Sequence, residues 1–556
     1  MSEYLLEWRR RILERVGGFD DVVDALLQLF QLLLAGGPAA AGRPHGIVIT
    51  GPPGSGKSHL ADAVAEAMAP SGSAPAAVDV AAAVTGSPEA MAALRSALDK
   101  ATQRARCCQP SGGLVVLVLE RAESLRPAPA DEDEDAARKT LDPRRAVSEQ
   151  LLSELRLWRD EGLPAAVLMP WTAAAPVPPE LCGAGALELV IALPTPLAFG
   201  QRRAVLEVCA RSLRLRDGAD ALLNFEAGAT AGFLPCDLAA LCRAAALSAV
   251  HRAGASGASA AAVSVVADDF ALAHQRTQPT LMRGVATAVR QPMHALGAAA
   301  TGTSGSGLGT VVGQSLVVEM LRARVVRPFL QLTGEVPPDE VAGRGAETAS
   351  TAELPVGVLL EGAPGTGKTY VAQQLAAELR ARAFAAAPAD ILAPQVGEAE
   401  KRMQRLFDSA RKSAPSVVII EDVDAIAPTG TGEASSEEDP PEEGSETHVA
   451  CVLRAEVDAV RTGRLRRAPE ASLLVVATTS DGARVAGWLR APHRLALACR
   501  LSPWMSPGDV AQLLRQGFHG RGPPDAVLAE AAAVLCGACR GAEGAAAAAC
   551  CRAAAV

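Results

Sequence analysis

The chain contains two stretches of one pattern, Gly51-Pro52-Pro53-Gly54-Ser55-Gly56-Lys57-Ser58 and Gly362-Ala363-Pro364-Gly365-Thr366-Gly367-Lys368-Thr369. Both match G-x-x-x-x-G-K-S/T at every fixed position, which is the signature of a phosphate-binding loop. Each stretch follows a short apolar run, at 46–50 or 357–360, and precedes a segment with helical periodicity, at 59–64 or 370–375. This order of strand, loop and helix brings backbone N–H groups and the positive end of a helix to one place. The sequence therefore predicts two sites that bind the phosphates of a nucleotide.

The last two residues of each loop have expected roles in such a site. Lys57 and Lys368 are expected to reach the β- and γ-phosphates. The hydroxyl groups of Ser58 and Thr369 are expected to bind Mg²⁺. We therefore expect each site to hold a nucleotide together with Mg²⁺.

The length and composition of the chain favour two domains with aliphatic cores. A chain of 556 residues is too long for one core and suits two domains of about 250 residues each. Hydrophobic residues make up 49% of the chain and aromatic residues only 3%, so Ala, Val and Leu must form most of each core. The net charge of −9 argues against non-specific nucleic-acid binding. The chain has no apolar run of about 18 residues and no signal-peptide order of charges, so we expect no membrane span.

A duplicated domain organises the chain. Gly51 and Gly362 are 311 residues apart, which suits a repeat of whole domains rather than of solenoid units. Two apolar runs follow each loop, at 114–120 and 165–169 in the first copy and at 417–422 and 473–478 in the second. Strands that alternate with helices predict an α/β fold, with a parallel sheet sandwiched by helices in each copy. Residues 197–277 show helical patterns and no long strand, which predicts a small helical lid subdomain.

These patterns divide the chain into five expected segments. They are a first large subdomain at 1–196, a helical lid at 197–290, a flexible linker at 291–312, a second large subdomain at 313–503 and a partial second lid at 504–556. The last segment is called partial because its Ala-rich end indicates either a short lid or a truncated chain. Two acidic, apolar-poor segments, 131–135 and 429–448, are expected to be disordered loops.

Several further segments are similar to one known family. They are 396–402, 406–411 and 421–428 in the second copy, 230–242 in the first lid, and 269–283 at the junction. With the two loops, they make the chain resemble the double-ring AAA+ ATPases of the valosin-containing-protein type, including the ribosome-maturation and peroxisomal-biogenesis ATPases. The resemblance implies two P-loop AAA+ modules and ATP as the nucleotide.

The acidic pair that ends the motif strand departs from the family pattern in both copies. In the family, an Asp supports Mg²⁺ and the following Glu polarises the attacking water. Here Glu421 takes the place of the Mg²⁺-binding Asp, and Asp422, one methylene shorter than Glu, takes the place of the catalytic Glu. We therefore expect slow hydrolysis at the second site, with normal turnover as the alternative. The first copy has Glu120-Arg121, and because Arg cannot act as a base, we expect this site to bind ATP with little turnover.

Two other residues are implied by the resemblance to act in catalysis at the second site. Thr479 aligns with the polar residue that senses the γ-phosphate, whose first-copy counterpart falls near Thr172 or Ala173. Arg494 aligns with an arginine that reaches the neighbouring subunit, although a surface role is its alternative. The first-copy counterpart of the Arg494 segment, 179–187, has no arginine. Both copies also lack the aromatic residue that unfoldases use to grip polypeptide.

The resemblance implies an ATP-hydrolysing protein that couples nucleotide state to the remodelling or disassembly of protein complexes. It implies a homo- or hetero-hexamer that works with protein clients and adaptors in the cytoplasm, with a peroxisome-associated or nuclear location as alternatives. The competing hypothesis is a catalytically impaired, nucleotide-binding scaffold subunit of a hetero-oligomeric ring. Arg121 and the missing pore aromatics favour the scaffold, whereas Lys368, Thr369 and Arg494 favour the enzyme.

Overall fold

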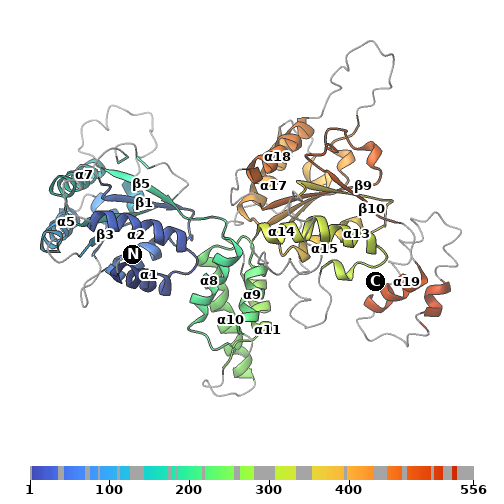
Figure 1. Ribbon diagram of the computed structural model, residues 1–556, viewed down its shortest axis with the longest axis horizontal. Helices are drawn as coiled ribbons and strands as arrows, with labels where there is room; N and C mark the ends of the chain where they lie inside the picture. The colour runs from blue at the N-terminus through green and yellow to red at the C-terminus, as the bar shows by residue number, and fades with distance from the viewer. Residues whose placement is uncertain are drawn as a thin grey trace, which may run out of the picture. The chain divides into compact units, whose positions relative to one another are not determined.

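A computed structural model of the chain shows two separate sheets and a group of helices between them in sequence (Figure 1). It describes residues 3–34, 43–68, 76–85, 88–108, 113–125, 143–172, 177–178, 181–182, 186–215, 219–255, 263–277, 279–280, 307–333, 354–392, 397–429, 448–465, 472–502, 506–517, 527 and 529–534. The expected acidic loop at 131–135, residues 430–447 of the loop expected at 429–448, and most of the expected linker lie outside these ranges.

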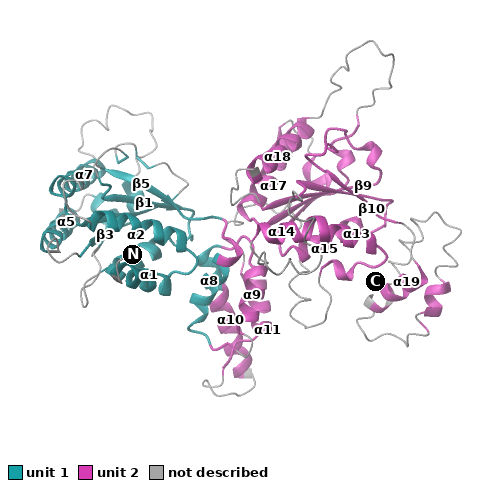
Figure 2. Cartoon of the chain, in the orientation of Figure 1, with its two compact units in different colours: residues 1–195, 201–213, 234–240 teal, residues 196–200, 214–233, 241–556 magenta. Residues whose placement is uncertain are grey.

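The chain divides into two compact units, which Figure 2 colours separately. Unit 1 comprises Met1–Thr195, Gln201–Leu213 and Leu234–Ala240, and unit 2 comprises Pro196–Gly200, Arg214–Phe233 and Leu241–Val556. Each unit contains one sheet and one phosphate loop. The five segment boundaries expected from the sequence stay a prediction.

The sheet of unit 1 has five parallel strands in the order β2-β3-β4-β1-β5. The strands are β1 (Gly46–Gly51), β2 (Ala76–Asp79), β3 (Val115–Glu120), β4 (Ala165–Thr172) and β5 (Leu187–Ala192). The helices of this unit that come before β5 are α1 (Glu3–Arg15), α2 (Asp20–Leu34), α3 (Lys57–Met68), α4 (Val80–Val84), α5 (Pro88–Cys108) and α7 (Pro143–Glu161). The central strands are continuous apolar runs because helices bury both faces of a parallel sheet.

The sheet of unit 2 repeats this topology with the order β10-β6-β9-β8-β7. The strands are β6 (Gly357–Glu361), β7 (Arg382–Ala386), β8 (Ser416–Ile420), β9 (Leu473–Thr479) and β10 (Leu497–Arg500). The helices after the expected linker are α13 (Ser315–Leu321), α14 (Arg327–Leu332), α15 (Lys368–Glu378), α16 (Pro388–Ile391), α17 (Glu398–Lys412), α18 (His448–Leu465) and α19 (Pro507–Gly517). Side chains of β6 alternate between two cores, since Leu359 packs on one face and Val358 and Leu360 pack on the other. The predicted fold class, an α/β fold with two parallel sheets between helices, is confirmed.

The helical region between the sheets consists of α8 (Phe199–Ala210), α9 (Ala219–Ala229), α10 (Pro235–Ala255) and α11 (Ala267–Arg276). Two polar pairs join its helices. The Arg252 guanidinium donates to both carboxylate oxygens of Asp269 at 3.2 and 2.8 Å, and a nitrogen of His274 lies 2.7 Å from a carboxylate oxygen of Glu226. This region is helical, as the sequence patterns predict.

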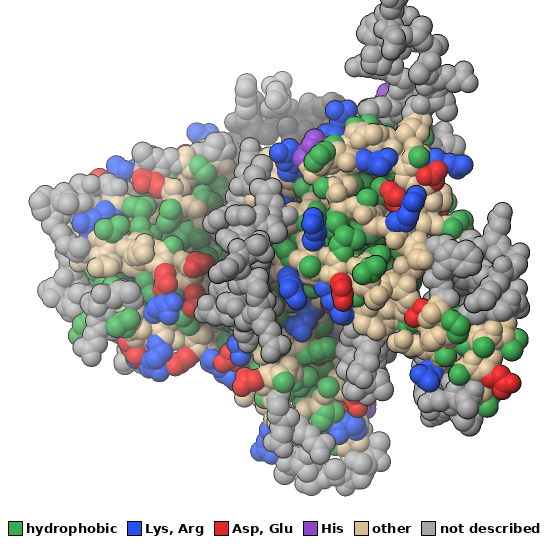
Figure 3. All heavy atoms as spheres, turned by 45° about the vertical axis from the view of Figure 1, so that its right-hand side comes forward, with side chains coloured by type: hydrophobic (Ala, Val, Ile, Leu, Met, Phe, Trp, Pro, Cys, Tyr) green, Lys and Arg blue, Asp and Glu red, His purple; other side chains and the backbone are tan. Residues whose placement is uncertain are grey.

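The described surface drawn in Figure 3 carries side chains of both charges. Within the described ranges, every helix is too short or too polar to cross a lipid bilayer. On the face drawn in Figure 3, basic and acidic side chains of the described residues are scattered among apolar ones.

Candidate functional site

The second phosphate loop, residues 362–369, joins β6 to α15 at the carboxyl edge of its sheet. Gly365 and Gly367 have φ angles of +81° and +86°, which residues with a Cβ rarely adopt. Backbone in this conformation turns successive N–H groups toward one concave side, which favours an anion. The loop therefore has the backbone that a phosphate site requires.

The ammonium group of Lys368 lies against this loop. Its Nζ donates to the carbonyl oxygens of Gly362 and Ala363 at 2.7 and 3.2 Å. Burial lowers the pKa of Lys368, whereas the carboxylates of Asp422 and Asp424 raise it. The ammonium group thus contacts the loop, while the charges of two acids that follow β8 favour its protonated form.

The first phosphate loop, residues 51–58, has the same geometry. Gly54 and Gly56 have φ angles of +84° and +93°. The Nζ of Lys57 donates to the carbonyl oxygens of Gly51 and Pro52 at 3.0 and 2.9 Å, and burial lowers its pKa. The structure thus provides the same cation and loop backbone twice.

A buried hydroxyl group lies inside each loop. The Oγ1 of Thr366 donates to the carbonyl oxygen of Ala363 at 2.9 Å, whereas the Oγ of Ser55 is buried without a hydrogen-bond partner. A Cβ added at Gly51 would lie 2.7 Å from the Ser55 Oγ, and one added at Gly362 would lie 2.9 Å from the Thr366 Oγ1. The first glycine of each loop is therefore needed to leave room for this hydroxyl group.

Acidic and hydroxyl side chains gather at the ends of β8 and β9. Thr479 donates from its Oγ1 to Asp424 Oδ1 at 2.9 Å and accepts the N–H of Asp481 at 3.3 Å. The N–H of Asp422, whose φ is +42°, donates to the Thr478 Oγ1 at 3.2 Å. The structure therefore brings Lys368, Asp422 and Thr479 to one sheet edge.

Asp424 belongs to this cluster although the sequence reasoning assigned it no role. It is the partner of the Thr479 hydroxyl group and one of the two carboxylates that raise the pKa of Lys368. The sequence could have indicated this role, because Asp424 is the third carboxylate of the acidic segment 421–424.

Oxygen ligands for Mg²⁺ are available at the second site. Glu421 is half-buried at the end of β8, and its N–H donates to the carbonyl oxygen of Ala386 at 3.0 Å. Thr369 is half-buried next to Lys368 at the start of α15. Carboxylate and hydroxyl oxygens are suitable ligands for this hard cation, so these residues fit the group.

The first site differs from the second at the end of its motif strand. Glu120 is exposed, and Arg121 forms an ion pair with Asp79. Asp79 also caps α4, because its Oδ1 accepts the N–H of Ala81 at 3.1 Å. A cation therefore stands in the first site where the second site has the Asp422 carboxylate.

Strand register places a tryptophan at the first-site position that corresponds to Thr479. Thr50 pairs with Trp171 in the first sheet, and Glu361 pairs with Thr479 in the second. Thr50 and Glu361 each precede the first glycine of a loop, so Trp171 and Thr479 occupy equivalent positions. The sequence places the counterpart of Thr479 near Thr172 or Ala173, and the contact of the Thr172 hydroxyl group with Glu123 matches that of the Thr479 hydroxyl group with Asp424. The indole of Trp171 belongs to the apolar core, and the next residue, Thr172, supplies a hydroxyl group at this edge of the first sheet.

Arg494 is only 7% exposed and makes contacts within its own chain. Its Nε and Nη2 donate to the two carboxylate oxygens of Asp458 at 2.8 Å each, and its Nη1 donates to the carbonyl oxygen of Trp488 at 2.8 Å. Arg494 also holds the pKa of Asp458 below its usual value. The action of Arg494 on a neighbouring subunit stays a prediction, and it would require these contacts to open.

Replacing Arg494 by alanine is expected to lower the free energy of unfolding by about 2–3 kcal/mol, because three charge-assisted hydrogen bonds are lost. Urea unfolding followed by circular dichroism measures this change. Arg490 is exposed and makes one hydrogen bond at 3.3 Å, to the carbonyl oxygen of Gly482, so Arg490→Ala is the matched control with a small effect. Equal stabilities of the two variants would contradict a structural role for Arg494 and favour its release toward a neighbour.

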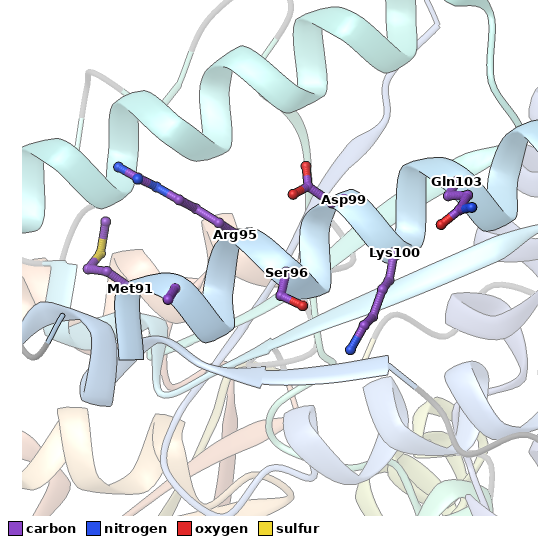
Figure 4. A pocket seen from close by; sticks show the side chains of 7 residues that line it. Met91, Arg95, Ser96, Asp99, Lys100 and Gln103 are labelled. Atoms are coloured by element: carbon purple, nitrogen blue, oxygen red, sulfur yellow. The ribbon is translucent and has the colours of Figure 1, made fainter. Parts of the chain in front are cut away.

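A surface hollow of unit 1 lies away from these residues. Figure 4 shows that Met91, Arg95, Asp99 and Gln103 of α5 line it, together with Ala92, Ser96 and Lys100. None of the residues predicted to bind nucleotide lines this hollow.

Comparison with known proteins identifies both loop-bearing regions. The family model described as "ATPase family associated with various cellular activities (AAA)" matches residues 47–174 and 358–499. The chain is 26% identical to the ATPase family gene 2 protein homolog B of Bos taurus over 423 residues, which cover 74% of this chain and 48% of that protein. It is 26% identical to the nuclear valosin-containing protein-like of Mus musculus over 455 residues, or 75% of this chain and 49% of that protein. It is 25% identical to the cell division cycle protein 48 homolog of Archaeoglobus fulgidus over 501 residues, or 86% of this chain and 58% of that protein. The chain thus spans about half the length of the curated relatives it matches.

Proposed function

We propose that this chain, which belongs to the AAA family and carries two of its modules, binds ATP at both modules and hydrolyses it mainly at the second module. Hydrolysis would couple the nucleotide state to the remodelling or disassembly of protein complexes. The observation that carries the proposal is the cluster of Lys368, Asp422, Asp424 and Thr479 at one sheet edge beside the second phosphate loop.

The residues of the second module have separate tasks in this reaction. Lys368 binds the β- and γ-phosphates together with the N–H groups of residues 362–369. Asp422 accepts a proton from the water whose oxygen bonds to the γ-phosphorus while the bond to the β,γ-bridging oxygen breaks. Thr479 orients the γ-phosphate end of the site, and Asp424 holds the Thr479 hydroxyl group in place. Mg²⁺ bound by Thr369 and Glu421 would neutralise phosphate charge.

Partners and location belong to the same proposal. A homo- or hetero-hexamer with protein clients and adaptors agrees with the double-module family, as does a cytoplasmic location with a nuclear or peroxisome-associated alternative. Arg494 of one subunit would act on its neighbour once it leaves Asp458.

A second candidate function is a nucleotide-binding scaffold subunit in a hetero-oligomeric ring. It is favoured by the first module, where Arg121 replaces a carboxylate. Such a subunit would contribute binding surface and little turnover.

Phosphate release by the purified chain distinguishes the two candidates. For the enzyme, we expect Mg²⁺-dependent ATP hydrolysis whose specific rate rises with protein concentration, because ring assembly brings Arg494 to a neighbour. Light scattering in ATP should then show particles with six times the mass of one chain. Nucleotide binding with no hydrolysis at any protein concentration would reject the enzyme and favour the scaffold.

A further inference from the structure

Arg121 and Asp422 occupy equivalent backbone positions in the two modules. Each follows a glutamate, Glu120 or Glu421, that comes at the end of the motif strand. Their φ angles are +51° and +42°, so the same uncommon backbone conformation is kept while the side-chain charge changes sign. The substitution therefore places a guanidinium where the fold otherwise directs a carboxylate.

The ion pair of Arg121 leaves it able to exchange partners. The side chain of Arg121 is 67% exposed and that of Asp79 is 31% exposed. Exposed ion pairs contribute little stability because water solvates both groups. Asp79 also keeps a second role as the cap of α4, so it needs no cation to remain in place. Arg121 can thus leave Asp79 for another anion at low cost.

The charges near the first loop do not suit a divalent cation. At equivalent positions, the second module has three carboxylates, Glu421, Asp422 and Asp424, whereas the first has Glu120, Arg121 and Glu123. A guanidinium has no lone pair to bind a metal, and its charge repels one. Ser58 and Glu120 keep the positions of the two predicted Mg²⁺ ligands Thr369 and Glu421, but the guanidinium of Arg121 next to Glu120 makes the first module fit Mg²⁺ less well than the second.

The same guanidinium suits phosphate oxygens well. Arginine presents several N–H donors in a planar fork that matches two oxygens of a phosphate group. Lys57 lies in the loop that follows β1, and Arg121 follows the motif strand β3, whose carboxyl end lies at the same edge of the sheet. Lys57 and Arg121 together would then supply the positive charge that a metal ion supplies elsewhere.

We propose that the first module is a magnesium-independent nucleotide site, in which Arg121 binds the phosphates in place of the metal ion. The inference rests on the proposed function, because it takes the first phosphate loop to be a nucleotide site. It makes this module a stable nucleotide holder whose occupancy does not follow the Mg²⁺ level.

Titration of a fluorescent N-methylanthraniloyl-ATP into the full chain tests this inference. Lys368→Ala leaves the first site as the measured one, and Lys57→Ala leaves the second. In the Lys368→Ala chain, replacing Mg²⁺ by EDTA should change the dissociation constant less than about threefold, whereas in the Lys57→Ala chain it should weaken binding more than about tenfold.

Variants of the ion pair provide matched controls in the Lys368→Ala chain. Arg121→Asp restores the carboxylate and should make binding depend on Mg²⁺. Asp79→Asn releases Arg121 while preserving a good helix cap, so it should tighten binding in EDTA. Thermal unfolding shows whether each variant remains folded.

The outcomes separate this inference from the proposed function. If the Lys368→Ala chain binds the analogue only when Mg²⁺ is present, the inference is wrong and the nucleotide site stands. If Arg121→Asp binds in EDTA as tightly as the parent, Arg121 is not a phosphate ligand and the inference is also wrong. If no analogue binds in either buffer, the first nucleotide site itself is refuted, and the inference with it.

Discussion

Replacing Lys368 by alanine is expected to reduce steady-state ATP hydrolysis by at least about 100-fold, the usual cost of removing a charged group that stabilises the transition state. Lys368 is the cation of the second phosphate loop, and Asp422 and Asp424 favour its charged form. Without it, the charge that develops on the γ-phosphate loses its nearest fixed cation. Phosphate release at saturating ATP and Mg²⁺ measures the loss.

Lys57→Ala is the matched control because the first loop has the same geometry. Lys57 contacts two loop carbonyl oxygens in the same way as Lys368. Its site has Arg121 in place of the carboxylate base, so we expect the variant to keep most of the turnover while losing one bound nucleotide. A larger loss of hydrolysis in Lys57→Ala than in Lys368→Ala would show that the first module is the main ATPase.

Features that depend on neighbours in sequence could be predicted from the sequence. The phosphate loops combine fixed glycines with flanking strand and helix patterns, and such local signals need no knowledge of packing. The parallel sheets followed from apolar runs such as 417–420, since only strands covered on both faces are apolar throughout. The resemblance to double-module AAA+ ATPases is confirmed by the two matched regions.

Features that depend on distant partners could not be predicted in this way. Asp458 precedes Arg494 by 36 residues and lies on α18, so their ion pair depends on how that helix packs. Asp79 and Arg121 meet because β2 and β3 are neighbours in the sheet. The position of Trp171 required strand register, because a shift of one residue in a strand moves a side chain to the other face. The catalytic and metal-binding roles of Glu421, Asp422, Thr479 and Arg494 stay predictions.

Placing the family residue, glutamate, at position 422 should accelerate ATP hydrolysis at the second site. Asp422→Glu is expected to raise the single-turnover rate of ATP hydrolysis by up to about 100-fold, because an added methylene extends the carboxylate by more than about 1 Å. The backbone at this position is anchored, since the N–H of Asp422 donates to the Thr478 Oγ1 at 3.2 Å. The longer side chain therefore extends the reach of the carboxylate without moving its attachment point. Rapid-quench measurement with the full chain in excess over ATP isolates this step from product release.

Because the backbone of Asp422 is left-handed, this experiment needs a control for stability. Asp adopts a positive φ more readily than Glu, so Asp422→Glu should cost about 1 kcal/mol of stability, and the gain in rate must be compared at equal folded fraction. Asp422→Asn keeps the size of the side chain and removes the base, so its rate should fall below that of the parent chain. If the parent, Asp422→Glu and Asp422→Asn all turn over at the same rate, Asp422 does not accept the proton. The base would then have to be sought among the other carboxylates of this sheet edge, of which Asp424 already contacts the Thr479 hydroxyl group.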